Sequence, residues 1–208
     1  MNDINLNELP DKFVLKVNHG SGMNIFCKDK KKFDLEKAKR QLKIWININF
    51  GLKQNEFQYL FVKRRIFVAP YLADRIIDYE FYCFNGNPKF VRVQKLLNEF
   101  RHLKLHNYYD FNWNLLDIES GLKGYIRDPN IIIEKPKNLN LMLDYSTKLS
   151  KDFVFLRVDF YEINDIVYLS ELTFTPSNTF VTFKNREQSL YLGSLIDLSK
   201  IKSSLFNK

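Results

Sequence analysis

Two short segments in the C-terminal third of the chain restrict its fold more than any other feature. They are Arg157-Val-Asp-Phe-Tyr161 and Ser170-Glu-Leu-Thr-Phe-Thr-Pro176, and each is a run of the residue types that favour β-strands. Glu171 follows Asp159 by twelve positions. A strand, a short turn and a second strand predict a hairpin, so the chain should contain an antiparallel sheet with an arginine and two carboxylates on it.

The two carboxylates share a sheet face only if the turn has the right length, because side chains alternate between the faces of a strand. A two-residue Asn164-Asp165 turn would pair Asp159 with Ser170 and direct Glu171 to the opposite face. We therefore expect a three-residue loop, 164–166, with a bulge on one strand as the alternative. Carboxylates on one face suit a hard divalent cation such as Mg²⁺. Ordinary surface carboxylates on an edge hairpin are the simpler interpretation.

Arg157 precedes Asp159 by two positions and is expected on the same face. A planar guanidinium there can neutralise a phosphate or a developing acyl phosphate. The alternative is a structural salt bridge to Glu171.

A glycine-containing turn lies near the N-terminus. Residues 13–18 and 23–27 are predicted strands, and His19-Gly-Ser-Gly22 joins them. Glycine lets backbone amides approach an anion closely, and Lys16 could contact phosphate oxygens. A P-loop is rejected, since its lysine follows the glycines at the start of a helix. An ordinary hairpin turn beside an exposed lysine is the alternative.

The remaining elements follow from periodicity and capping signals. Asp34 is expected to cap a helix, and Asn85-Gly86 is the strongest hairpin signal in the chain. The predicted elements are a helix over 35–49, a strand over 58–68, an extended connector over 69–72, strands over 79–84 and 89–94, an irregular stretch over 96–137, a helix beginning after Asn138, and a last helix over 187–196.

Composition limits the class of protein. Nineteen Phe and eleven Tyr against seven Gly in 208 residues predict a sheet-rich α+β fold with a sizeable core. The chain has no secretory start and no apolar run long enough for a membrane span, so a cytoplasmic location is expected. Cys27 and Cys83 are expected to be buried strand residues. The net charge of +8 would attract polyanions, but no nucleic-acid-binding motif accompanies it, so a nucleic-acid partner is not expected.

The ordered set of motifs resembles the TupA-like ATP-grasp family, named for teichuronopeptide biosynthesis. The resemblance implies an α+β ATP-grasp fold of two lobes, 9–70 and 71–208, with mainly antiparallel sheets and flanking helices. Proteins of this kind carry a preceding domain, whereas here eight residues precede Leu9, so that domain is expected to be absent. The residues that carry the resemblance are Leu9-Pro-Asp-Lys-Phe-Val-Leu-Lys-Val-Asn-His-Gly-Ser-Gly22, Asp78-Tyr-Glu-Phe-Tyr-Cys-Phe-Asn-Gly-Asn-Pro88, Tyr109-Asp-Phe-Asn-Trp-Asn114, Phe155-Leu-Arg-Val-Asp159 and Glu171-Leu-Thr-Phe-Thr-Pro176.

The resemblance also implies ATP and Mg²⁺ as ligands, with ATP held between the lobes under the glycine turn. Thr173 stands where the wider superfamily usually has a metal-binding asparagine. The implied site consists of Lys16, His19, Gly20, Ser21 and Gly22 at the phosphates, Tyr71 and Leu72 at adenine, Glu80 at ribose, Arg157 at the transferred phosphoryl group, and Asp159, Glu171 and Thr173 at the metal.

The activity implied by the resemblance is ATP-dependent ligation of a carboxylate to an amine through an acyl phosphate, in bacterial cell-surface polysaccharide biosynthesis. The acceptor would be a sugar acid or an amino acid, a class that we extend to a lipid-linked glycan. Two alternatives are phosphoryl transfer to a glycan hydroxyl at the same nucleotide site, and a basic polyanion-binding module that keeps a vestigial nucleotide fold.

Overall fold

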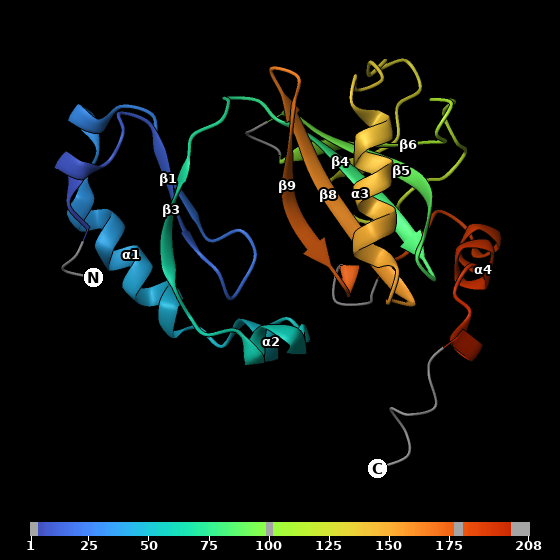
Figure 1. Ribbon diagram of the computed structural model, residues 1–208, viewed down its shortest axis with the longest axis horizontal. Coiled ribbons are helices and arrows are strands. Elements are labelled where there is room, and N and C mark those ends of the chain that lie inside the picture. Colours follow the sequence, from blue (N-terminus) through green and yellow to red (C-terminus); the bar gives the residue numbers. More distant parts are fainter. Residues whose placement is uncertain (1–3, 99–101, 177–180, 201–208) are drawn as a thin grey trace, which may run out of the picture. The chain divides into compact units, whose positions relative to one another are not determined.

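The computed structural model describes residues 4–98, 102–176 and 181–200. The chain divides into two compact units, Met1–Ala73 and Asp74–Lys208 (Figure 1). Each unit has its own sheet and its own apolar core.

The first unit, Met1–Ala73, is a three-stranded antiparallel sheet with a helix packed on one face. The strand order is β2-β1-β3. Its elements are β1 (Phe13–Val17), β2 (Asn24–Cys27), β3 (Ile66–Pro70), α1 (Leu35–Asn47), α2 (Phe50–Lys53) and the 3-10 helices Leu6–Glu8, Lys30–Lys32 and Phe57–Phe61.

Helix α1 forms where the sequence predicts it. The Asp34 carboxylate accepts a hydrogen bond from the Lys37 amide at 2.8 Å, which caps the first turn. The helix ends at Asn47, two residues before the predicted end, because Ile48 takes an extended conformation. Its buried residues Ala38 and Leu42 pack into the core of the first unit, against the inward face of β1.

The strand expected over 58–68 is wrong for most of its length. Residues 57–61 form a 3-10 helix, and the strand of this region is β3 at Ile66–Pro70. Pro70 ends this strand opposite Phe13. Proline fits there because its missing N–H removes no bond from the middle of the sheet.

The second unit, Asp74–Lys208, is built on a six-stranded sheet in the order β7-β6-β5-β4-β8-β9. Neighbouring strands are antiparallel except for the parallel pair β6 and β7. The elements are β4 (Ile77–Phe84), β5 (Asn87–Asn98), β6 (Leu103–Tyr109), β7 (Tyr125–Ile126), β8 (Phe155–Ile163), β9 (Ile166–Thr173), α3 (Leu139–Ser150), α4 (Arg186–Ser194) and the 3-10 helix Leu198–Lys200.

Several predictions for this unit are confirmed and one is wrong. Asn85 and Gly86 both have positive φ angles, 50° and 79°, which is the type I′ geometry expected for the β4–β5 turn. Helix α3 begins after Asn138, although the Asn138 side chain donates to Glu162 instead of capping the helix. The irregular stretch expected over 96–137 contains strand β6 at Leu103–Tyr109.

The two faces of the large sheet differ in chemistry. Helix α3 covers one face (Figure 1), where apolar side chains such as Phe81, Val93 and Val158 form the main core. Side chains one position away point to the other face. That face holds Glu80, Arg92, Arg157 and Asp159, so the buried charged side chains in the described part of this unit lie on the side opposite α3. Cys83 lies buried on the apolar face, and Cys27 is buried in the first unit, as predicted.

Among the residues that the structure describes, no helix has the length and apolar character needed to cross a bilayer.

Candidate functional site

The β8–β9 hairpin places Asp159 and Glu171 on one sheet face, but the backbone feature that does so differs from the expected one. The turn has two residues, Asn164 and Asp165, both with positive φ (52° and 64°), between the paired residues Ile163 and Ile166. The predicted three-residue loop 164–166 is therefore wrong. The alternative, a bulge, is what the structure contains.

The bulge lies between the turn and the carboxylates. The strand register shifts after Asp159, so that Phe160 pairs with Leu169 while Asp159 pairs with Glu171, and Ser170 is the extra residue. With a two-residue turn alone, Asp159 would pair with Ser170, and Glu171 would point to the opposite face. The single inserted residue shifts the pairing by one position, so that Glu171 pairs with Asp159. Asp159 and Glu171 consequently face each other across adjacent strands on one sheet face.

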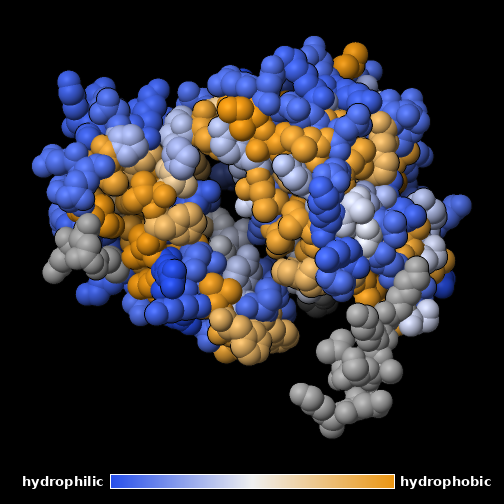
Figure 2. Space-filling view, in the orientation of Figure 1, coloured by the Kyte–Doolittle hydropathy of each residue, from blue (hydrophilic) through white to orange (hydrophobic). Residues whose placement is uncertain are grey.

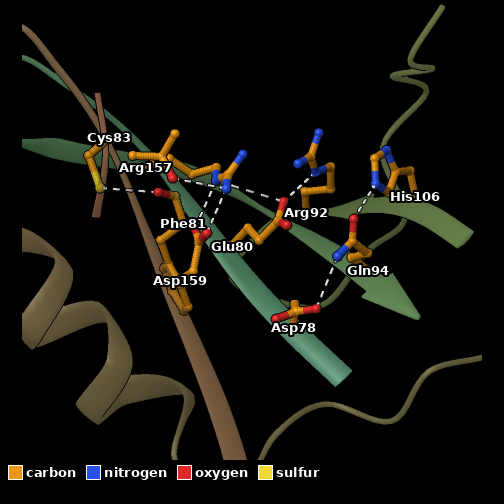
Figure 3. A network of polar contacts seen from close by, with 10 residues as sticks. Asp78, Glu80, Phe81, Cys83, Arg92, Gln94, His106, Arg157 and Asp159 are labelled. Atoms are coloured by element: carbon orange, nitrogen blue, oxygen red, sulfur yellow. Dashed lines mark hydrogen bonds and ion pairs between the residues drawn. The ribbon is translucent and has the colours of Figure 1, made fainter. Parts of the chain in front are cut away.

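A row of charged side chains continues from this pair across the sheet. Glu80 on β4 pairs in register with Asp159 on one side and with Arg92 on β5 on the other. The row therefore reads Arg92, Glu80, Asp159, Glu171 over four neighbouring strands (Figure 3 shows the first three with Arg157). Arg92 on β5 and Glu80 on β4 have opposite charges, whereas Asp159 on β8 and Glu171 on β9 are both acids. The row therefore has an excess of negative charge near β8 and β9.

Arg157 offsets part of this negative charge. Its guanidinium makes two hydrogen bonds to Asp159, Nε to Oδ1 at 2.8 Å and Nη2 to Oδ2 at 2.6 Å, and a third to the Thr173 hydroxyl at 3.0 Å. Its Nε also lies 4.0 Å from a carboxylate oxygen of Glu80. The predicted sharing of one face by Arg157 and Asp159 is thus observed. Burial is the largest influence on Asp159 and raises its pKa to about 7, although Arg157 acts in the opposite direction.

Glu80 is held by two guanidinium groups. Arg92 Nε donates to Glu80 Oε2, and both side chains are almost fully buried. Burial alone would raise the pKa of Glu80, but Arg157 and Arg92 outweigh it and hold the pKa below its usual value. A carboxylate fixed in this way is poorly placed to bind ribose hydroxyls. The expected ribose role of Glu80 stays a prediction, and these contacts favour another carboxylate of the same face for it.

Asp78 is a better placed carboxylate, and the sequence analysis did not single it out. It lies two positions before Glu80 on β4 and therefore on the same face, but it is only partly buried. Gln94 Nε2 donates to its carboxylate at 3.0 Å. Burial, and then the charge of Glu80, raise the pKa of Asp78 to about 6. The signal that could have found it is the alternation in Asp78-Tyr-Glu80, which places both acids on one face.

His106 extends the Asp78–Gln94 contact on β6 (Figure 3). Its Nε2 lies 3.0 Å from Gln94 Oε1. Because the Gln94 amide donates to Asp78, its oxygen must accept, and His106 Nε2 carries the proton. Burial, with Arg92 next, lowers the pKa of His106, and its ring stacks on Tyr125 at 4.0 Å between centroids. These contacts make His106 a neutral support for Gln94.

In the first unit, the glycine turn is anchored at one end. His19 is buried, with Nε2 3.1 Å from the Ile48 carbonyl oxygen just after α1. A Cβ on Gly20 would lie 2.8 Å from the Phe50 ring, so close packing requires glycine there. Ser21 and Gly22 are exposed, and Gly22 has a φ of +74°. The part of the turn that can approach a ligand is therefore its tip.

Lys16 lies on the face of the small sheet opposite α1. In register it is flanked by Asn24 on β2 and Phe67 on β3. Phe26, on the same face, is 59% exposed and contacts Tyr71 edge-on, with ring centroids 6.3 Å apart. This face thus combines Lys16 with accessible aromatic surface, and Lys28 Nζ lies 5.8 Å from the centroid of the Tyr71 ring. Leu72 follows Tyr71 and is half-buried.

The metal assignment can be tested against the residues present. In the described ranges, no cluster of three or more His, Cys, Asp or Glu side chains is positioned to hold a metal ion. Asp159 and Glu171 supply two carboxylates on adjacent strands, and Thr173 supplies a hydroxyl that presently accepts from Arg157. Mg²⁺ needs few protein ligands because it keeps waters and binds substrate phosphates. The donor set fits Mg²⁺ bound together with a nucleotide.

Comparison with known proteins identifies the family to which the chain belongs. A model of the family described as TupA-like ATPgrasp matches residues 1–197, and the chain belongs to this family. No curated protein matches the chain.

Among solved structures, the chain is similar to two D-alanine–D-alanine ligases. The enzyme from Helicobacter pylori is 17% identical with a TM-score of 0.45, and the match covers 91% of this chain and 49% of the ligase. The enzyme from Bacillus anthracis is 17% identical with a TM-score of 0.41, and the match covers 94% and 57%. The chain thus spans about half the length of these ligases.

Proposed function

We propose that the protein is an ATP-dependent carboxylate–amine ligase that acts through an acyl phosphate in bacterial cell-surface polysaccharide biosynthesis. The observation that supports this most is the β8–β9 bulge, which aligns Asp159 and Glu171 on one face beside Arg157. Membership of the ATP-grasp family agrees with it. A sheet that needed these groups only for stability would not require a bulge that pairs two acids.

Each residue has a role that follows from its environment. Asp159 and Glu171, with Thr173, would hold Mg²⁺, which when bound would neutralise charge on the nucleotide phosphates. Lys16 and the tip of the glycine turn, Ser21 and Gly22, would contact the phosphates. Tyr71 and Leu72 would contact adenine.

Two assignments change in the light of the contacts. We transfer the ribose role from Glu80 to Asp78, because Asp78 shares the face and is only partly buried, whereas Glu80 is almost fully buried. We give His19 and Gly20 the role of fixing the base of the glycine turn through Ile48 and Phe50, instead of direct contact with phosphate.

Arg157 would stabilise the transferred phosphoryl group. It is buried, always charged, and carries a planar array of donors that matches a phosphate as well as a carboxylate. In the structure these donors hold Asp159 and Thr173. Asp159 would hold the cation, and the Arg157 guanidinium, no longer paired with this carboxylate, would donate to the phosphoryl oxygens. Catalysis would then come from positioning and charge neutralisation.

The acceptor follows from the family resemblance more than from the geometry. We propose a sugar acid or an amino acid, free or on a lipid-linked glycan, and we place the reaction in the cytoplasm, where ATP is abundant.

The direct test is release of ADP in the presence of panels of uronic acids and amino acids, followed by mass measurement of the product. A ligase yields an amide, which is lighter than its two substrates together by one water. A phosphorylated product would replace the proposal with phosphoryl transfer. Absence of ADP release with every acceptor pair, in a chain that binds ATP, would contradict the ligase assignment for this chain.

A further inference from the structure

Four exposed apolar side chains of the first unit, including its most exposed one, Phe61, belong to one short helical hairpin. Helix α2 and the 3-10 helix Phe57–Phe61 pack on each other, with the Glu56 amide donating to the Gly51 carbonyl at 2.9 Å. Phe61 is 89% exposed, and three further members are 42–58% exposed. We name the set Leu52, Phe57, Leu60 and Phe61 the apolar ridge.

The inward side of the hairpin is well packed, so the exposure of the apolar ridge does not result from a poorly formed segment. Phe50 and Tyr59 contact each other edge-on at 5.3 Å between centroids. A Cβ on Gly51 would lie 3.0 Å from the Glu56 carbonyl oxygen and 3.0 Å from the Leu60 side chain, so the two helices approach closely and Leu60, although 42% exposed, also packs on α2. The hairpin therefore presents the apolar ridge on a defined scaffold.

Basic residues surround the apolar ridge in sequence. From Lys39 to Arg65 the chain has seven Lys or Arg and one acid, Glu56, so this segment carries +6 of the net charge of +8. Lys43, Lys53 and Lys63 are exposed, and in the described part of the chain none of the three makes an ion pair. Figure 2 shows apolar surface over the α2 region with hydrophilic residues beside it.

We propose that this hairpin docks on an anionic membrane surface. Protruding aromatic and leucine side chains with lysines around them are the pattern of proteins that insert a few side chains into the headgroup region of a bilayer. Each lysine near such a surface strengthens binding about fivefold. A protein partner fits less well, because lysine is depleted at protein–protein interfaces.

The proposal concerns attachment to a membrane without a spanning segment, and it does not depend on the ligase activity. It would, however, bring the protein to the surface where a lipid-linked acceptor resides. Because Phe50 of the same hairpin packs against Gly20 of the glycine turn, docking would also place the candidate phosphate loop at a fixed distance from the bilayer.

The test is co-sedimentation of the full chain with vesicles, without nucleotide. One vesicle is phosphatidylcholine alone and the other contains about one third phosphatidylglycerol. We expect binding to the anionic vesicle, weakened by salt. Phe57→Ser with Phe61→Ser should reduce the affinity at least tenfold, and Lys53→Gln with Lys63→Gln about 25-fold. Ile132→Ser is the matched control, since Ile132 is 86% exposed on the second unit, and it should change nothing.

Equal binding to both vesicles, no binding, or unchanged binding by the Phe57 and Phe61 variant would each overturn the proposal. The proposal would also be overturned if the parent protein did not bind vesicles and light scattering showed that it is a dimer, which the Phe57 and Phe61 variant converts to a monomer. The apolar ridge would then be a contact between two copies. Circular dichroism of each variant confirms that these exposed substitutions leave the fold intact.

Discussion

Arg157 donates two hydrogen bonds, of 2.8 and 2.6 Å, to the two carboxylate oxygens of Asp159, which lies two positions further along β8. A cation that binds Asp159 must therefore share or displace this guanidinium. The pair compensates the charge of a buried carboxylate. In the proposed function, it would link metal binding to the arrival of a group that attracts Arg157 away from Asp159.

The first prediction follows from this competition. Arg157→Gln should allow Mn²⁺ or Mg²⁺ to bind Asp159 and Glu171 in the absence of nucleotide, because the guanidinium no longer occupies the carboxylate. The measurement is the midpoint of thermal unfolding with and without metal. A metal-dependent rise is expected in the variant and not in the parent. The same response in both proteins would show that Arg157 does not control access to the site.

The second prediction concerns the buried pair of Glu80 and Arg92. Arg92→Met should lower the free energy of unfolding by about 3–5 kcal/mol, because it leaves a buried carboxylate with one more distant arginine. Adding Glu80→Gln should recover at least half of the loss, since the uncompensated charge is then removed. Urea denaturation measures both. Lys137→Met, which breaks the exposed ion pair with Asp165, should leave the midpoint unchanged. A double variant no more stable than Arg92→Met would contradict the account.

The third prediction is a pH dependence of stability from Asp78. Its pKa is raised from 3.8 to about 6 in the folded protein, so the folded state binds the proton more tightly than the unfolded state. The stabilisation is complete below the unfolded pKa and is lost as the pH rises through about 6. Asp159, with a pKa of about 7, has the same sign. Asp78→Asn should therefore flatten the fall in stability between about pH 4 and 7, by at most about 3 kcal/mol. A variant with the slope of the parent would contradict this.

The fourth prediction separates backbone strain from steric clash. Gly86 and Gly22 have similar φ angles, +79° and +74°, but a Cβ on Gly86 would lie 3.0 Å from the Lys151 backbone, whereas Gly22 has nothing within 4 Å. Gly22→Ala should cost about 1 kcal/mol from strain alone. Gly86→Ala should cost at least 1 kcal/mol more. Chemical denaturation of the two variants makes the comparison, and equal losses would show that Lys151 adjusts freely.

Much of the fold follows from local sequence signals. Asp34 predicts the start of α1, and Asn85-Gly86 predicts the β4–β5 hairpin, because each acts through a contact within a few residues. The strand expected over 58–68 fails because β-propensity reports packing on a sheet, and Phe57–Phe61 packs as a short helix on α2 instead.

The candidate site shows the same division between local and non-local information. The sequence indicates Asp159 and Glu171 as candidate metal ligands. Their alignment, however, depends on the bulge at Ser170, which no residue type in the sequence predicts. The capture of Glu80 by Arg92 and Arg157 depends on three strands meeting in register, and so does the Asp78–Gln94–His106 contact. Pairing between distant strands determined these contacts, and a single sequence does not contain that pairing.

The most direct test of the central claim is calorimetry of ATP binding, with and without Mg²⁺, for the parent, Lys16→Ala and Asp159→Asn. The account predicts that Lys16→Ala weakens ATP binding at least tenfold under both conditions, whereas Asp159→Asn removes the strengthening by Mg²⁺. Asp165→Asn, at the tip of the same hairpin, serves as the control and should bind as the parent does. ATP binding that is unchanged in both Lys16→Ala and Asp159→Asn would contradict the assignment of the nucleotide site.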